Sequence, residues 1–237
     1  MYAARQGALD AARALAQSGA ALDLTDPDGT PALTIAIING HYDVASLLAE
    51  HGADVNVADR TGATPLYSAV DMHTLASSFG RPDLPHPAVG GSVEAVRMLL
   101  AHGADPDARL KTKVLKRVYN PGDARLADGG TPLMRAAKTG DVTMMRLLID
   151  AGADVDSVNA AGDTALHFGV AFPAAVRLLA ESGATLDITN RRGLSPLATL
   201  LGARDRNDAV IAFLREWTGD YTTQAPAPSP AAPRRTR

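Results

Sequence analysis

Apolar residues recur along the chain in short blocks with helical spacing. Within a block they fall three or four positions apart, or side by side, which places them on one face of a helix. Two such blocks are Val93, Val96, Leu99 and Leu100, and then Val142, Met145, Leu148 and Ile149. A helix this short cannot bury its apolar stripe alone, so the pattern predicts several short helices that pack on one another.

These blocks belong to a repeat that has two independent markers. A Gly-Ala pair recurs at Gly19, Gly52, Gly103, Gly152 and Gly183, and the leucine of a Thr-Pro-Leu-like phrase recurs at Leu33, Leu66, Leu133, Leu166 and Leu197. Both markers show a step of 33 residues, as from Gly19 to Gly52 and from Leu33 to Leu66. A fixed period of this length predicts a stack of helical repeats.

The phrases GATPLYSAV, GGTPLMRAAKTGD and GDTALHFGV resemble ankyrin repeats, and the resemblance covers the chain from residue 3 to about residue 218. It implies an all-α ankyrin-repeat solenoid, with stacked helix-turn-helix units, protruding β-turn fingers and two long loop insertions. The Ala- and Arg-rich composition and the insertions resemble bacterial ankyrin proteins. The phrase also has a direct physical meaning, because Thr64, Thr131 and Thr164 can cap an inner helix whose first position suits Pro65 or Pro132.

The markers divide an expected ankyrin-repeat domain, residues 1–221, into six units. The units span about 1–26, 27–59, 60–107, 129–160, 161–190 and 191–219, with an extended basic finger at 108–128. Met1 falls where a Thr-Pro-Leu phrase is expected, which predicts repeats or a leader upstream. At the other end Trp217 is expected to cover the last layer, and the Pro- and Ala-rich tail, residues 222–237, is expected to be disordered.

Two insertions interrupt the repeat on either side of one outer helix. The first adds 18 residues within 71–90, where three prolines and two glycines predict a loop. The second adds 16 residues before Leu133, where Leu110, Thr112 and Val114 alternate with lysines and Asn120–Asp123 reads NPGD, so an extended hairpin is predicted. Insertions must project from the stack, and they are where a repeat scaffold is expected to carry its particular function.

Charge is concentrated in the second insertion. Residues 109–125 hold six cations and one acid, a local charge of +5 in a chain whose net charge is -3. The insertion is interpreted either as a docking arm for an acidic partner or as a solvated loop. Nucleic-acid binding is the weaker alternative, because Tyr119 is its only aromatic residue and no nucleic-acid-binding motif accompanies it.

The chain offers few residues for catalysis or metal binding. It has no cysteine, which excludes disulfides and thiolate chemistry. Of its six histidines, four fall at landmarks of the repeat and have structural interpretations: His41, His51, His102 and His167. His73 and His86 lie near Asp71 and Asp83 in the first insertion, without the spacing of a metal site. Asp54, Asp105 and Asp154 recur at the finger bases, which indicates backbone capping. No catalytic residue, metal or cofactor is predicted.

The resemblance therefore implies a non-catalytic scaffold that binds another protein through its concave face, its fingers and the basic insertion. The residues expected at the interface are Tyr67, Asp71, Arg109, Lys111, Lys113, Lys116, Arg117, Tyr119, Arg135 and Lys138. We expect a monomer or a member of a hetero-complex. The alternative is a regulatory or targeting portion of a larger bacterial protein or secreted effector. No apolar run is long enough to span a bilayer, so the chain as given is expected in the cytoplasm, or in the periplasm or outside the cell if a leader precedes Met1.

Overall fold

The described part of the chain is a stack of paired helices. The computed structural model describes residues 1–75, 89–114, 123–203 and 206–219. Within these ranges there are twelve helices, and the only β pairing is an isolated bridge between Thr25 and Pro31. The helices are α1 (Tyr2–Gln6), α2 (Leu9–Gln17), α3 (Ala32–Ile38), α4 (Tyr42–Glu50), α5 (Pro65–Leu75), α6 (Val89–Ala101), α7 (Pro132–Ala137), α8 (Val142–Asp150), α9 (Ala165–Gly169), α10 (Pro173–Glu181), α11 (Pro196–Leu201) and α12 (Asp208–Thr218).

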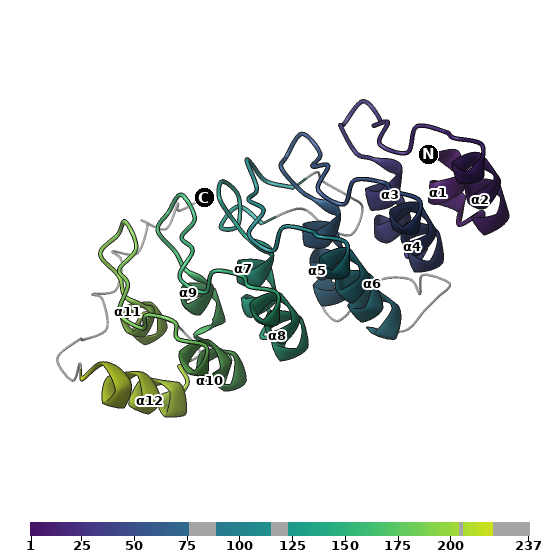
Figure 1. Ribbon diagram of the computed structural model, residues 1–237. Coiled ribbons are helices and arrows are strands. Elements are labelled where there is room, and N and C mark those ends of the chain that lie inside the picture. The colour runs from purple at the N-terminus through teal and green to yellow at the C-terminus, as the bar shows by residue number, and fades with distance from the viewer. Residues whose placement is uncertain (76–88, 115–122, 204–205, 220–237) are drawn as a thin grey trace, which may run out of the picture.

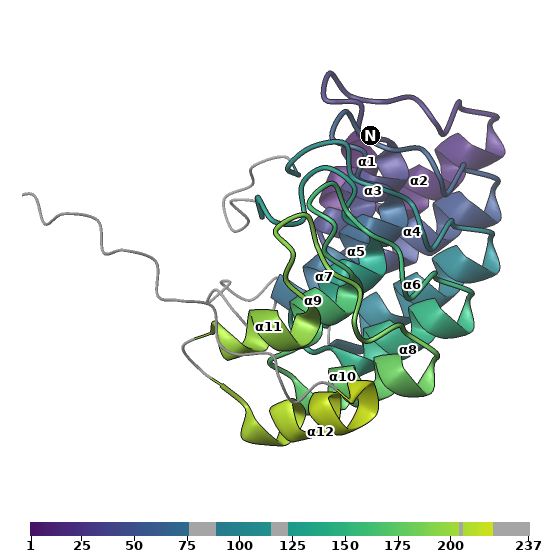
Figure 2. The same ribbon diagram turned by 90° about the vertical axis from the view of Figure 1, so that its left-hand side faces the viewer.

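The helices form two layers, and the loops between successive pairs project as fingers. The odd-numbered helices form an inner row, each packed on the next, and the even-numbered helices form an outer row in the same way. Figure 1 shows the pairs following one another from the N-terminus to the C-terminus, with the fingers all on one side; Figure 2 shows the same stack turned by a quarter turn. The predicted all-α solenoid is confirmed. No helix in the described ranges is both long and apolar enough to cross a membrane.

The inner helices begin where the repeated phrase predicts. The hydroxyls of Thr64, Thr131 and Thr164 each accept a hydrogen bond from the amide three residues later, at 3.2 to 3.4 Å. Proline occupies the first helical position in α5 and α7, where no amide donor is needed. In α3 the capping position holds Pro31, which makes no side-chain cap, yet the helix still begins one residue before the marker leucine, at Ala32.

One inner helix is longer than predicted. Helix α5 continues to Leu75 and α6 begins at Val89, so the loop predicted for residues 71–90 is wrong at both of its ends. The reason lies at position 73, where His73 replaces the glycine that follows the inner helices α3 and α7 at the equivalent position. Gly40 and Gly140 take left-handed φ angles of 78° and 68° at this point. Without such a residue the helix continues. The middle of the insertion, 76–88, lies outside the described residues.

The core runs through the whole stack as one apolar cluster. The five marker leucines are at most 2% exposed, so the residue that defines the repeat is also its central packing residue. The last layer is closed by Val210, Ile211 and Leu214 of α12. Trp217 is 58% exposed and contacts the ring of Phe213 one turn earlier. The prediction that Trp217 covers this layer is therefore wrong.

Candidate functional site

The fingers are rigid turns that a short polar side chain stabilises. In four of them the Oδ1 atom of Asp26, Asp59, Asn159 or Asn190 accepts hydrogen bonds from the amides two and four residues later, at 2.8 to 3.1 Å. A left-handed glycine lies inside each turn. This Asx arrangement fixes the turn by local bonds alone.

Successive fingers are also bonded to each other. The amides of Arg60, Lys111, Ala160 and Arg191 donate to a carbonyl of the preceding finger, at 2.8 to 3.1 Å. The contact is so close that a Cβ atom at Gly62 would lie 2.7 Å from the backbone of Arg109 and Lys111. We call these linked turns, residues 26–30, 59–63, 109–113, 128–130, 159–163 and 190–194, the finger row. The row forms one continuous edge along the stack.

The second insertion grows out of this row. Leu110 is buried and exchanges backbone hydrogen bonds with Gly129 and Gly130, at 2.6 and 3.0 Å, so the two ends of the insertion are paired. Beyond this pair Lys111, Thr112 and Lys113 are all exposed, which contradicts the predicted alternation at Thr112. No regular strand is present in the described part of the insertion. The first three residues of the predicted NPGD turn, 120–122, and the residues Lys116, Arg117 and Tyr119 lie outside the described residues.

Two arginines of the insertion bind the neighbouring finger. Arg109 donates to the carbonyl of Val158 at 2.7 Å and to the Ser157 hydroxyl at 3.1 Å. Arg125 donates to Asp163 Oδ2 at 3.3 Å, and its guanidinium lies 4.7 Å from the centre of the Phe168 ring. These partners were not expected from the sequence. Half of the described basic side chains in the insertion therefore make contacts within the protein itself.

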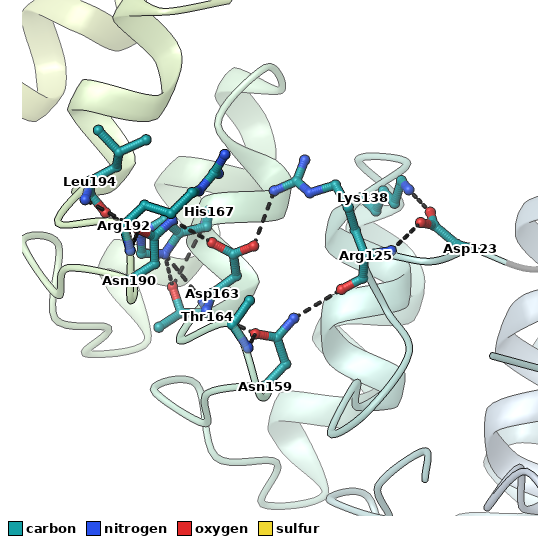
Figure 3. Close-up of polar contacts among 11 residues, drawn as sticks. Asp123, Arg125, Lys138, Asn159, Asp163, Thr164, His167, Asn190, Arg192 and Leu194 are labelled. Carbon is teal, nitrogen blue, oxygen red and sulfur yellow. Dashed lines mark hydrogen bonds and ion pairs between the residues drawn. The ribbon is translucent and has the colours of Figure 1, made fainter. Parts of the chain in front are cut away.

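The insertion returns across the inner helices. Figure 3 shows Asp123 paired with Lys138, beside Arg125 and Asp163. Lys138 directly follows α7 and is half-buried, and this burial lowers its pKa. The side-chain amide of Asn159 donates to the backbone carbonyl of Arg125 at 2.9 Å. We call residues 123–127 the return segment, because they bring the insertion back to α7.

Three residues expected at the interface are buried instead. Tyr67, Asp71 and Arg135 are 3%, 4% and 8% exposed. Arg135 Nε donates to Asp71 Oδ1 at 2.6 Å, and burial, with the nearby Asp71 charge, raises the pKa of the Tyr67 phenol above its usual range. The expectation that they lie off the buried face is wrong, because α5 and α7 pack side by side and opposite charges on adjacent inner helices pair across that contact.

His167 has a structural position that fits its place in the repeated phrase. The Thr164 amide donates to His167 Nδ1 at 3.1 Å, so Nε2 carries the proton that bonds the Leu194 carbonyl at 3.0 Å (Figure 3). Together with the Thr164 hydroxyl this forms a capping box at the start of α9. Burial lowers the pKa of His167, although the Leu194 bond opposes the shift. The neutral imidazole thus joins one unit to the next.

His73, near the end of α5, contacts residues of two other elements. Its Nδ1 lies 2.6 Å from the Ser92 hydroxyl and its Nε2 lies 3.1 Å from Asp141 Oδ2. Asp141 also caps α8 by accepting from the Met144 amide at 3.0 Å. Burial raises the pKa of Asp141, but the bonds from His73 and the amides outweigh it, so the pKa is lowered overall. Within the described ranges no three histidine or acidic residues cluster as a metal site, and His86 lies outside them.

The remaining charged landmarks serve the backbone. Asp54, Asp105 and Asp154 each accept from the amide two residues later, at 2.8 to 3.0 Å, as predicted. His51 and His102 lie 2.9 Å from a carbonyl of the helix that each one ends. His41 Nε2 lies 3.2 Å from the Arg5 carbonyl of the preceding unit. These residues stabilise the repeat and leave the finger row as the distinctive surface.

A two-layer helical solenoid with a hydrogen-bonded row of turns is the architecture of a repeat-type binding protein. The family profile for ankyrin repeats (3 copies) matches residues 1–110 and 108–192. The chain belongs to the ankyrin-repeat family. Ankyrin repeats are generally protein–protein interaction modules and are typically non-catalytic.

Curated relatives include the neurogenic locus notch homolog protein 1 of several vertebrates. The human protein is 34% identical over 176 residues, and that of Xenopus tropicalis is 31% identical over 175. Each match covers 73% of this chain, which spans about 6% of the length of these relatives. Their complete functions therefore do not transfer to this chain.

Solved ankyrin domains have the same fold. The ankyrin repeat domain of human ASB11 has a TM-score of 0.67 at 24% identity, covering 97% of this chain and 92% of that domain. An ankyrin repeat domain from Acinetobacter baumannii AYE has a TM-score of 0.70 at 27% identity, covering 92% of this chain and 96% of the other. The similar proteins thus include vertebrate and bacterial ones, and a bacterial origin stays a prediction.

Proposed function

We propose that this chain binds an acidic segment of another protein along its finger row and basic insertion, without catalytic activity of its own. The observation that carries the proposal is the exposure of Lys111 and Lys113 at the middle of the row. Arg191 and Arg192 are exposed on the last finger. Two pairs of exposed cations on a rigid edge favour an extended partner of opposite charge.

The contacts of the acidic residues support a cationic binding surface. Asp54, Asp105 and Asp154 are at the bases of the fingers and are bonded to backbone amides. Asp71 is buried against Arg135. Many acids are thus engaged in the scaffold, whereas Lys111 and Lys113 are exposed to solvent and attract an acidic partner.

A charge reversal tests the proposal with a defined probe. A fluorescein-labelled decaglutamate peptide is titrated into the full chain and into Lys111→Glu/Lys113→Glu. We expect the double variant to bind about tenfold more weakly or worse and to lose most of the salt dependence. The matched control is Arg13→Glu/Arg177→Glu, which changes the net charge equally at exposed positions of α2 and α10. Equal weakening by both variants would show that only net charge matters and would overturn the proposed surface.

A second candidate is that the chain acts as a regulatory or targeting portion of a larger bacterial protein or secreted effector. It is favoured because the matched region makes up only about 6% of the length of the notch relatives, in which it is part of a much longer chain. Sequencing of the complete transcript in the source organism tests this candidate. A reading frame confined to this chain would contradict it.

A further inference from the structure

All four lysines of the protein belong to one region. Lys111, Lys113 and Lys116 are in the basic insertion, and Lys138 is the fourth, whereas arginines are spread along the chain. Lys138 differs from the two described lysines of the insertion in its surroundings. Lys111 and Lys113 are exposed, but the side chain of Lys138 is only 31% exposed and lies at the end of an inner helix. Lys138 follows the last residue of α7, so this short helix separates it from finger residues 128–130.

The partner of Lys138 comes from the insertion itself. Asp123 is the only acid within residues 109–125, and its Oδ2 atom pairs with the Lys138 ammonium (Figure 3). An acidic side chain thus occupies a cationic position next to the surface proposed to bind an acidic partner. The chemistry that holds Asp123 is the same chemistry that would hold a glutamate or aspartate from outside.

The return segment does not depend on this ion pair for its position. Arg125 is held by Asp163, by the Phe168 ring and by the Asn159 amide. Leu126 is 1% exposed, and a Cβ atom on Gly130 would lie 2.1 Å from its carbonyl oxygen. The backbone is anchored at residues 125 and 126, and Asp123 Oδ1 accepts a hydrogen bond from the Arg125 backbone amide at 2.9 Å. The Lys138 ammonium can therefore move from Oδ2 to another carboxylate while the segment stays in place.

The ion pair is also of a kind that exchanges readily. Both side chains are about one-third exposed, at 31% and 30%. Ion pairs that water reaches contribute little to stability, because hydration of the separated charges offsets most of the attraction. A carboxylate delivered by a bound partner at high local concentration can therefore replace the internal one.

We propose that Lys138 is a carboxylate-binding subsite for the acidic partner, and that Asp123 fills it as an internal substitute in the unbound protein. This inference rests on the proposed function and adds a defined contact to it. The partner's acidic segment lies across Lys111 and Lys113 and places one carboxylate on Lys138. Asp123 competes with it and weakens binding.

Removal of the internal carboxylate tests the competition. We expect Asp123→Asn to bind the decaglutamate peptide about threefold to tenfold more tightly than the unaltered chain, as the loss of one competing exposed ion pair allows. The matched control is Asp150→Asn, which removes the same charge from an exposed residue at the end of α8, outside the finger row and the insertion. Equal tightening by both variants would attribute the effect to net charge and would overturn the subsite.

Lys138 itself gives the second arm. In Lys138→Gln the gain from Asp123→Asn is expected to disappear, so the double variant binds as Lys138→Gln does. A gain that persists without Lys138 would overturn the inference. If binding depends on Lys111 and Lys113 but not on Asp123, the inference fails while the proposed function stands. If the peptide does not bind at all, the proposed function fails as well.

Carbodiimide coupling gives a readout that needs no binding curve. The reagent joins carboxylates to amines that are in contact, and the chain has only four lysines. In the free protein we expect an Asp123–Lys138 cross-link by peptide mass spectrometry, and in the presence of decaglutamate its replacement by a cross-link from Lys138 to the peptide. An internal cross-link that saturating peptide leaves undiminished would contradict the exchange.

Discussion

Charged side chains in this protein differ in role according to their surroundings. Arg135 and Asp71 are almost fully buried and hold each other, whereas Lys111 and Lys113 are exposed on the finger row. Loss of one buried partner leaves an uncompensated charge in a medium that solvates it poorly. Loss of an exposed lysine changes mainly the field that a partner meets. We therefore expect Arg135 to affect stability and the two lysines to affect binding.

Replacement of Arg135 tests this division. Arg135→Met is expected to lower the free energy of unfolding by about 3 kcal/mol, because Asp71 is left buried without the guanidinium. Urea denaturation followed by circular dichroism measures the change. Arg146→Met, at an exposed position of α8, is the control and is expected to cost less than about 0.5 kcal/mol. Similar losses in both variants would contradict a stabilising role for the buried pair.

His167 gives the protein a pH dependence of known sign. Because burial lowers its pKa, the unfolded chain takes up a proton near pH ~6.5 that the folded protein takes up only at lower pH. Stability is therefore full above this pH and decreases as the pH falls below it. His167→Gln can keep the capping box and has no imidazole to titrate. We expect it to show a smaller loss of unfolding free energy between about pH 7.5 and about pH 5.5.

Equilibrium denaturation at several pH values measures this difference. The control is His102→Gln, which replaces an exposed ring at the end of α6. A pH profile that His167→Gln leaves unchanged would refute the assignment. The lowered pKa of Asp141 acts in a separate window, because stability from an ionised carboxylate is lost only as the pH falls below about 4.

At the scale of elements, the residues that cap helices in this fold have two roles. Thr131 and Asn207 cap only their own helices, and each accepts a hydrogen bond from one backbone amide. Asp141 caps α8, and its side chain also pairs with the imidazole of His73 near the end of α5. A cap that also contacts a second element couples two units. Its loss should therefore lower the free energy of unfolding by more than the loss of a cap that contacts only its own helix.

A comparison of two caps tests that coupling. Asn207→Ala is expected to cost about 1 kcal/mol, the usual contribution of a helix cap. Asp141→Ala is expected to lower the free energy of unfolding by about 1 kcal/mol more than Asn207→Ala does, because the contact with His73 is lost as well. Denaturation of both variants and of His73→Ala/Asp141→Ala measures the coupling. Equal costs for the two single variants would mean that the His73 contact adds nothing.

The whole molecule is a one-dimensional stack in which each unit contacts its neighbours. Unit one, formed by α1 and α2, packs on one side against α3 and α4. Its helices are short and rich in alanine, α1 has no side-chain cap, and Tyr2 and Leu15 are 80% and 50% exposed. A central unit has neighbours on both sides. The free energy of local opening is therefore expected to be lowest at this end of the described stack.

Hydrogen exchange measures this gradient. We expect the amides of α2 to exchange through openings that cost at least about 2 kcal/mol less than those of α8, a helix of equal length at the centre of the stack. Exchange is followed by mass spectrometry of peptides from the two helices in one sample, so conditions are identical. Equal protection of α2 and α8 would show that the stack opens as a single cooperative unit.

The parts that could be predicted are those that depend on near neighbours in sequence. The caps at Thr131 and Thr164 need only an amide three residues away, and the 33-residue period shows itself without any structure. The extension of α5 could have been read from the missing glycine at position 73. The charge of the insertion was also evident, and the exposure of Lys111 and Lys113 fits its interpretation as a docking arm.

The sequence by itself thus determined the repeat, the helix starts, the fingers and the location of the positive charge. Only the tertiary structure decided which charged residues are left for a partner. Arg135 and Asp71 are 64 residues apart, and the register of α5 against α7 brings them together. Lys138 meets Asp123 because the return segment crosses α7. Such pairs depend on how units with insertions of unequal length align in space. Whether a charged side chain is buried therefore depends on the residues that pack around it, which its own type does not specify.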